Sequence, residues 1–130
     1  MTVIVTDAGF AAEDWTGGFE DRADVADLAS DADLSGIEAR FGDLQLIRVA
    51  FPSFADGRGF GIARRLRDMG YTGRLRAQGH VIADQYAMAR RCGFDEVEIS
   101  SELAARQPED QWKFRANWQA HDYQSRLRAS

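Results

Sequence analysis

The segment from Phe51 to Phe60, FPSFADGRGF, holds the densest set of residues whose types and spacing could bind a ligand. Gly57 and Gly59 permit backbone conformations that other residues resist, and amides exposed before a helix favour an anion. Arg58 lies between them and contributes a guanidinium, which suits carboxylate, phosphate or sulfate. The segment lacks the phosphate-loop ending and the three-glycine dinucleotide pattern. An Asp-Gly turn that caps a helix is therefore the simpler alternative.

Arg76 is a second unusual position because it lies inside a predicted buried strand, where a guanidinium has to be paired. Asp56 and Asp84 are the expected partners. One interpretation is a structural ion pair that joins two strand ends. The other is that Arg76 and Arg58 hold a small oxyanion, with Asp84 and Gln85 as hydrogen-bonding neighbours. The predicted ligand-binding residues are Asp56, Arg58, Arg76, Asp84 and Gln85.

No residue is assigned a catalytic role. His80 follows a glycine at a predicted helix start and could act as a general acid or base, although a capping or surface role is the simpler interpretation. Cys92 is expected to be a buried, unreactive thiol at a helix end. His80, His121 and Cys92 lack any close ligand spacing, so no metal site is predicted.

Strand and helix patterns alternate between residues 44 and 99, and these elements must position the candidate residues. Residues 44–51 are nearly continuously apolar, as in a strand covered on both faces. Further strands are predicted over 73–78 and 94–99, with helices over 59–69 and 81–91. Strands that alternate with helices of about a dozen residues, joined by turns of about four, are expected to be parallel and to have right-handed crossovers. The predicted fold is α/β, with a mainly parallel sheet of βαβαβ units that resembles either a barrel fragment or a doubly wound sheet.

Ligands of parallel sheets bind at the carboxyl ends of the strands. The segment 51–60 lies at such an end, as do residues 78–80 and 100–101, so we expect these three loops to converge.

The sequences on either side of this core differ in character, within one predicted domain that comprises residues 1–43, 44–99 and 100–130. Residues 1–43 form an acidic N-terminal segment, whose strand at 2–6 joins an edge of the sheet. Residues 13–35 have a weak helical or loop pattern, and we expect mobility there. From Pro108 onward one long helix is predicted, with Trp112 in one apolar stripe and Phe114 with Trp118 in a second. The second aromatic face either packs internally or docks a partner or a second copy of the chain.

Composition restricts the classes of function. The 130 residues carry 16 Lys+Arg against 21 Asp+Glu, a net charge of −5. This argues against nucleic acid as the main partner. Eleven of the acidic residues lie in residues 1–45, against two arginines. One cysteine excludes a disulfide scaffold, and we find no apolar run of membrane-spanning length and no secretory leader, so we expect a cytoplasmic protein.

Several runs, in this order, resemble the bacterial family named domain of unknown function 934. They are FPSFADGRGF at 51–60, ARRLR at 63–67, GYTG at 70–73, LRAQG at 75–79, DQ at 84–85 and RCGFD at 91–95. The resemblance covers roughly residues 44–99 and extends to the aromatic C-terminal helix. The family pattern carries onto Asp56, Gly57, Arg58, Gly59, Arg76, Gly79, Asp84, Gln85, Arg91, Cys92 and Gly93. His80 departs from it, because relatives have an acidic residue there.

The resemblance also implies a biological setting, since members of this family are labelled as probable oxidoreductases or proteins of sulfite reduction from their association with assimilatory sulfite reductase. We expect an accessory protein that binds sulfite reductase or its electron donor, and a small oxyanion. The alternative is a small oxidoreductase that uses a borrowed redox cofactor. The chain has no three-glycine fingerprint, Cys-x-x-Cys motif or iron–sulfur spacing. We therefore predict no cofactor and favour the accessory role.

Overall fold

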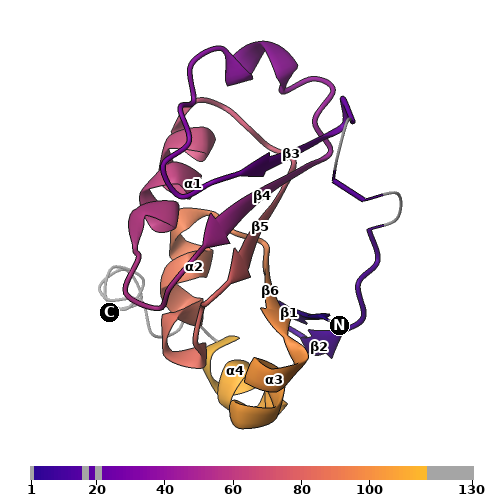
Figure 1. Ribbon diagram of the computed structural model, residues 1–130, viewed down its shortest axis with the longest axis vertical. Coiled ribbons are helices and arrows are strands. Elements are labelled where there is room, and N and C mark those ends of the chain that lie inside the picture. Colours follow the sequence, from indigo (N-terminus) through magenta and orange to yellow (C-terminus); the bar gives the residue numbers. More distant parts are fainter. Residues whose placement is uncertain (1, 16–17, 20–21, 117–130) are drawn as a thin grey trace, which may run out of the picture.

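Six strands form one sheet in the computed structural model, which describes residues 2–15, 18–19 and 22–116 (Figure 1). The strands are β1 (Thr2–Thr6), β2 (Gly9–Ala11), β3 (Val25–Leu28), β4 (Leu46–Phe51), β5 (Arg74–Gly79) and β6 (Glu96–Ser100). Their order across the sheet is β2-β1-β6-β5-β4-β3. Strands β3 to β6 pair in parallel, whereas β1 is antiparallel to both of its neighbours. The predicted α/β fold with a mainly parallel sheet is confirmed.

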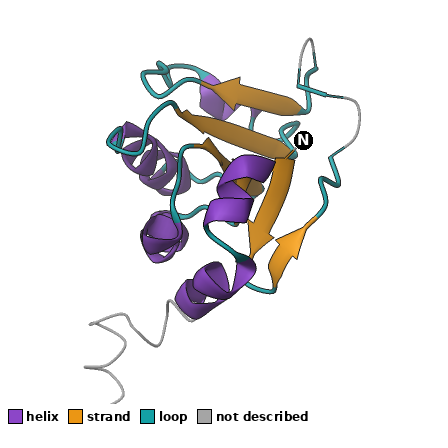
Figure 2. Cartoon of the chain, turned by 60° about the horizontal axis from the view of Figure 1, so that its bottom comes forward, coloured by secondary structure: helices purple, strands orange, loops and turns teal. Residues whose placement is uncertain are grey.

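In the described part of the chain, two helices connect parallel strands, and two more follow the last strand. They are α1 (Arg58–Asp68), α2 (Tyr86–Cys92), α3 (Ser101–Arg106) and α4 (Glu109–Ala116), with short 3-10 turns η1 (Ile37–Arg40) and η2 (Ala83–Gln85). Helix α1 links β4 to β5, and η2 with α2 links β5 to β6. Figure 2 shows the strands as one twisted sheet with helices beside it. None of the helices within the described ranges has the length and apolar character needed to cross a membrane.

The hydrophobic core lies between the sheet and helices α1 and α2, which occupy the same side of it (Figure 1). Side chains of a strand alternate between its faces, so Leu75 and Ala77 of β5 and Val97 of β6 enter this core. Ile62 and Leu66 of α1 cover them and are almost fully buried. A doubly wound sheet carries helices on both faces, whereas α1 and α2 cover one.

The opposite face of the sheet, which we call the open face, carries charged residues. The parallel register aligns Asp27 with Arg48, Arg48 with Arg76, and Arg76 with Glu96. The prediction that residues 44–51 are covered on both faces by apolar packing is therefore wrong for Arg48. The alternation between inward and outward side chains is hard to recognise in this sequence, because most residues around Arg48 are aliphatic. Ile47 and Val49 point into the core, while Arg48 points away from it.

Gly79 shapes the carboxyl edge of the sheet. Its φ of +117° is a left-handed conformation, and a Cβ atom there would lie 2.6 Å from the carbonyl oxygen of Phe51. This close approach lets the amide of His80 donate to the same oxygen, at 2.9 Å. The ends of β4 and β5 are thus joined where the candidate loops begin.

Some elements differ from the predicted ones. Strand β3 replaces part of the weak helical or loop pattern of residues 13–35, and β1 is not the outermost strand because β2 pairs with its other side. Helix α3 was not predicted; Ser100 caps it by accepting a hydrogen bond from the amide of Leu103 at 3.1 Å. The helix expected from Pro108 is present as α4, while its extension, with Trp118, lies outside the described residues.

Candidate functional site

A cavity of about 240 Å³ lies at the carboxyl edge of the sheet, where β5 and β6 end. Its lining comes from the three loops that were expected to converge and from the neighbouring ends of β1 and α3. The lining residues are Thr2, Phe54, Gln78, Gly79, His80, Ser100, Glu102, Leu103 and Arg106. The predicted convergence is confirmed for Phe54, His80 and Ser100. Arg106 was not singled out from the sequence, because it lies in the unpredicted helix α3.

His80 and Arg106 are the basic groups of this cavity. The imidazole of His80 stacks edge-on against Phe54, with 5.1 Å between ring centroids, and its Nδ1 lies 3.3 Å from the carbonyl oxygen of Phe51. Arg106 is exposed in the last turn of α3. Glu102 adds one carboxylate to the lining. The arrangement suits a small anion that accepts hydrogen bonds from a guanidinium and an imidazole.

Asp56 and Arg58 are paired with each other at the N-terminus of α1. The Arg58 guanidinium donates to both carboxylate oxygens of Asp56, at 2.9 and 2.7 Å, and to the hydroxyl of Ser30 at 3.0 Å. These hydrogen bonds from Arg58 hold the pKa of Asp56 far below its ordinary value. The carboxylate neutralises the guanidinium, so an incoming anion has to compete with Asp56 for Arg58.

Asp84 and Gln85 serve two different contacts at the η2 turn. Asp84 accepts a hydrogen bond from Arg115 of α4 at 2.9 Å. Gln85 accepts from the amide of Ile82 at 3.0 Å and donates to the carbonyl oxygen of Phe54 at 3.2 Å. Gln85 therefore ties the 51–60 loop to the start of α2, while Asp84 faces the C-terminal helix.

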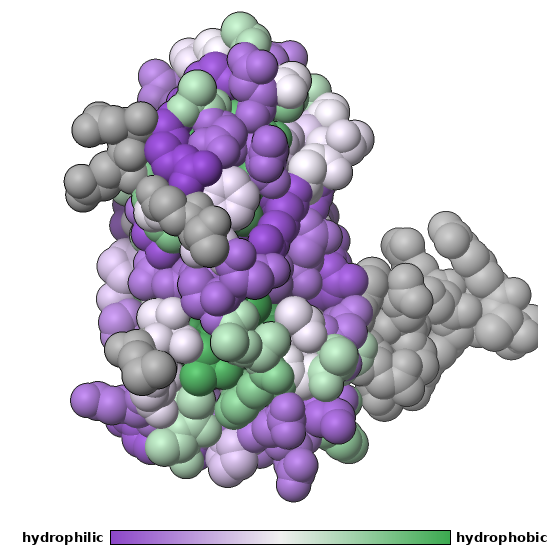
Figure 3. All heavy atoms as spheres, turned by 90° about the vertical axis from the view of Figure 1, so that its right-hand side faces the viewer, coloured by the Kyte–Doolittle hydropathy of each residue, from purple (hydrophilic) through white to green (hydrophobic). Residues whose placement is uncertain are grey.

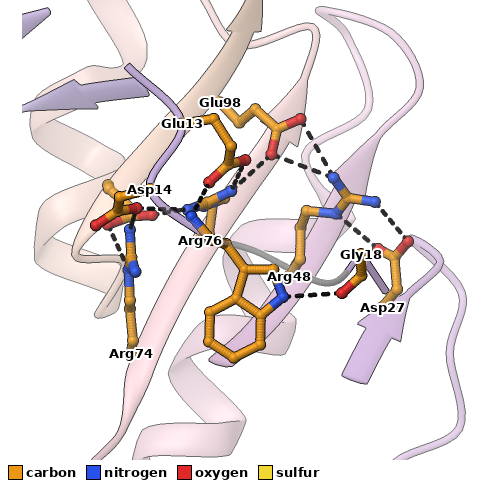
Figure 4. Close-up of polar contacts among 10 residues, drawn as sticks. Glu13, Asp14, Gly18, Asp27, Arg48, Arg74, Arg76 and Glu98 are labelled. Atoms are coloured by element: carbon orange, nitrogen blue, oxygen red, sulfur yellow. Dashed lines mark hydrogen bonds and ion pairs between the residues drawn. The ribbon is translucent and has the colours of Figure 1, made fainter. Parts of the chain in front are cut away.

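Arg76 lies apart from Asp56, Arg58, Asp84 and Gln85, which themselves make separate contacts. It is fully buried on the open face and binds Glu96 and Glu98 of β6 and Glu13 of the N-terminal segment (Figure 4). The predicted partners, Asp56 and Asp84, are wrong. Those residues lie beyond strand ends on the helical side, whereas Arg76 lies mid-strand and points away from the helices because faces alternate along β5.

Arg76 belongs to a larger group of ionised side chains, which we call the sheet-face cluster. It contains three guanidinium groups and five carboxylates: Glu13, Asp14, Asp27, Arg48, Arg74, Arg76, Glu96 and Glu98. Figure 3 shows the same side of the molecule, where hydrophilic residues form a broad band. Glu96 and Glu98 are 6% and 4% exposed. Buried carboxylates at this depth need their guanidinium partners.

A sequence signal for this cluster exists in the strands themselves. Charges of one sign alternate with apolar residues in RLRAQ at 74–78, and charges of the opposite sign alternate in EVEIS at 96–100. Two neighbouring parallel strands with this pattern place their charges on one face, where they pair. The N-terminal contribution from Glu13 and Asp14 has no such signal, because it depends on tertiary contacts between residues 60 and 63 positions apart in the chain.

Cys92 is 7% exposed, which confirms the predicted burial of the thiol. The guanidinium of Arg64 lies 3.8 Å from its sulfur. No group of three or more metal-ligating side chains occurs among residues 2–15, 18–19 and 22–116, and His121 lies beyond them.

Helix α4 presents two different aromatic environments. Trp112 is 1% exposed, contacts the ring of Tyr86 edge-on and donates to the carbonyl oxygen of Gln107 at 2.9 Å. Phe114, two residues further, is 66% exposed. It borders a shallow hollow of about 320 Å³ lined by Asp84, Asp110, Gln111, Phe114 and Arg115.

Comparisons with known proteins place the chain in a family. No curated protein and no solved structure matches it. A family model, described as "Bacterial protein of unknown function (DUF934)", matches residues 26–130, which include strands β4 to β6, helices α1 to α4 and the 51–60 loop. The chain therefore belongs to this DUF934 family of bacterial proteins.

Proposed function

We propose that the protein is an accessory factor of assimilatory sulfite reduction that binds sulfite reductase or its electron donor through the outer face of α4. The setting comes from the family resemblance described above. The single observation that carries the binding role is Phe114, which is 66% exposed on a helix whose opposite face is buried through Trp112. Aromatic side chains ringed by polar groups are typical centres of protein–protein contacts.

The surroundings of Phe114 support this role. The Arg115 guanidinium lies 5.3 Å from the centroid of the Phe114 ring and also binds Asp84. Asp110 and Gln111 complete the hollow beside it. A partner side chain that enters this hollow meets an apolar ring with charged groups of both signs around it, which favours a specific and reversible contact.

The test is affinity capture from the protein's own host, with the tagged full chain as bait. We expect sulfite reductase or its electron donor in the eluate of the unmodified chain and a loss of at least about tenfold with Phe114→Ala, as for a residue at the centre of an interface. Met88→Ala removes another exposed apolar side chain, outside both candidate sites, and is the matched control. Equal capture by the unmodified chain and Phe114→Ala would contradict the role of α4.

A small oxyanion is a second proposed ligand, favoured by the carboxyl-edge cavity with its Arg106 and His80. In calorimetric titration with sulfite, Arg106→Gln should weaken binding about tenfold, as expected for a lost charge-assisted contact. Arg58→Ala should leave it unchanged because Asp56 already occupies that guanidinium. If Arg58→Ala weakens sulfite binding and Arg106→Gln does not, the anion binds at the 51–60 loop instead. Absence of sulfite binding would remove this ligand from the proposal.

The alternative of a small oxidoreductase with a borrowed cofactor is tested by the absorption spectrum. The sequence has no three-glycine fingerprint, Cys-x-x-Cys motif or iron–sulfur spacing. We therefore expect the protein purified from its own host to be colourless. A bound yellow chromophore in the absorption spectrum would favour the oxidoreductase instead.

A further inference from the structure

We propose that the open face of the sheet is a docking surface for an acidic peptide segment of a partner protein, and that Glu13 and Asp14 occupy this surface in the free chain. The juxtaposition that carries the proposal is the contact of these two carboxylates with Arg76 and Arg74 of β5 (Figure 4). The proposal deepens the partner-binding role above, on which it rests, by naming a second surface and the chemistry that it recognises.

The two arginines divide their hydrogen bonds between the sheet and the N-terminal segment. The Nε atoms of Arg74 and Arg76 both donate to the carboxylate of Glu96. The outer nitrogens turn to the segment: Arg74 Nη2 donates to Asp14 at 2.6 Å, and Arg76 Nη1 donates to Glu13 at 2.6 Å as well as to Glu98. The sheet thus holds each guanidinium in place and leaves its outer edge for a carboxylate that comes from elsewhere.

Arg76 retains unused hydrogen-bonding capacity. Its side chain is fully buried, and its Nη2 makes no hydrogen bond with any residue that the structure describes, although Asp14 lies 3.7 Å away. A buried guanidinium nitrogen without an acceptor is costly. An acidic ligand with better geometry than Asp14 would satisfy it. Glu13 and Asp14 therefore act as an imperfect occupant of the arginine pair.

The charge balance of the sheet-face cluster indicates that Glu13 and Asp14 can be replaced by other carboxylates. Without Glu13 and Asp14, three arginines face three carboxylates, so the sheet itself is balanced and needs neither N-terminal group for neutrality. The side chain of Asp14 is 66% exposed and that of Glu13 is 29% exposed. None of the described residues between 12 and 24 is in a helix or strand. The occupant is thus accessible and lies outside the framework that holds the arginines.

An attached segment competes with a free peptide at an effective concentration in the millimolar range, so the unmodified chain should bind acidic peptides weakly. Removal of the two negative charges should leave Arg74 and Arg76 available to a free peptide. The variant E13Q/D14N, made in the full chain, keeps the shapes of both side chains. The matched control D31N/D33N removes the same number of charges from exposed positions outside the cluster.

The probe is a fluorescently labelled synthetic peptide with the sequence of residues 11–15, AAEDW, and its uncharged twin AAQNW. In anisotropy titrations at low salt, AAEDW should bind E13Q/D14N at least about tenfold more tightly than it binds the unmodified chain or D31N/D33N. AAQNW should show no such gain. Addition of Arg74→Gln to E13Q/D14N should abolish the gain, because it removes the more exposed guanidinium of the pair.

Equal binding of AAEDW to E13Q/D14N and D31N/D33N would overturn the proposal, as would a gain that survives Arg74→Gln. If E13Q/D14N does not fold, nuclear magnetic resonance of the unmodified chain decides: excess AAEDW should shift the indole N–H signal of Trp15, which neighbours the two carboxylates, and AAQNW should not. No difference between the peptides would overturn the proposal. These results are independent of Phe114, so capture of sulfite reductase through α4 can succeed or fail separately.

Discussion

At the scale of single residues, Arg76 shows how strongly one buried charge depends on its partners. Carboxylates of Glu96, Glu98 and Glu13 surround it, and the side chain is fully buried. Arg76→Met keeps much of the volume but leaves the two glutamates of β6 buried without this partner. We expect a loss of about 3–5 kcal/mol in the free energy of unfolding, measured by urea denaturation.

The control for this prediction is Arg65→Met, because Arg65 is exposed on α1. Its effect should stay within about 0.5 kcal/mol. Similar losses in the two variants would mean that the sheet-face cluster does not stabilise the fold.

Tyr86 gives a second prediction at this scale. Its ring is fully buried against Trp112, and its hydroxyl donates to Asp7 at 2.6 Å. Two causes raise the pKa of Tyr86 well above its ordinary value of 10.0: burial is the larger, and the contact with Asp7 is the second. A raised pKa means that the neutral tyrosine stabilises the fold below pH 10, and this contribution is lost as the pH rises further.

Tyr86→Phe should therefore cost about 1 kcal/mol at neutral pH, the typical net value of a hydrogen bond. It should also reduce the alkaline loss of stability, measured as the urea midpoint at neutral pH and above pH 10. An equal alkaline loss in Tyr86→Phe would show that another group is responsible.

The sequence allowed part of the candidate site to be predicted at the level of residues. The burial of Arg76 and its need for carboxylates follow from its place in an apolar strand, and both are confirmed. Its partners could not be predicted, because the face on which a side chain lies depends on strand register and on the position of the helices. Glu13 is 63 residues away in the chain, and nothing local indicates that contact.

At the scale of elements, the glycine at the end of β5 tests the account of the carboxyl edge. Gly79→Ala places a Cβ atom 2.6 Å from the Phe51 carbonyl oxygen in a left-handed conformation. We expect a loss of at least about 2 kcal/mol in the free energy of unfolding, measured by urea denaturation.

Gly61 is the matched control, since it is exposed within α1 and an added Cβ meets no atom within 4 Å among the described residues. Gly61→Ala should stabilise the protein by about 0.5–1 kcal/mol through better helix formation. If Gly79→Ala leaves the free energy of unfolding unchanged or raises it, the strain assigned to Gly79 is absent.

Three of the longer elements were predicted closely, but the helix predicted over 81–91 begins only at Tyr86, after the η2 turn, and the shortest elements were not predicted. The predicted strands 44–51 and 73–78 and the helix 59–69 agree with β4, β5 and α1 to within two residues at each end. Strand β3 has four residues and helix α3 has six, which is too few for a period to emerge. Their existence depends on pairing with β4 and on the cap at Ser100.

At the scale of the whole molecule, the acidic N-terminal segment and the arginine-rich remainder meet on the open face. Burial acts to raise the pKa of Glu13, but the hydrogen bonds from Arg76 and from the Trp15 amide, together with the charge of Arg76, lower it below its ordinary value. The hydrogen bond from Arg74 lowers the pKa of Asp14. Lowered pKa values mean that both contacts stabilise the fold above the ordinary values of 4.5 and 3.8, and that this stability is lost as the pH falls below them.

The unmodified chain should therefore lose more stability between neutral and acidic pH than E13Q/D14N, in which the two groups no longer titrate. The two proteins share every other charged group of the cluster, namely the three arginines with Asp27, Glu96 and Glu98. A difference between their urea midpoints therefore reports on Glu13 and Asp14. Identical acid profiles would show that the N-terminal segment is not held by these charges.

The central claim, that this protein supports sulfite reduction through a partner bound at α4, is tested most directly by sulfite reductase activity in host cells. Cells that lack the protein should have reduced activity, and the unmodified chain or Met88→Ala should restore it. Phe114→Ala should fold normally, since its ring is 66% exposed, but fail to restore the activity. Full reductase activity in cells without the protein, or full restoration by Phe114→Ala, would contradict the claim.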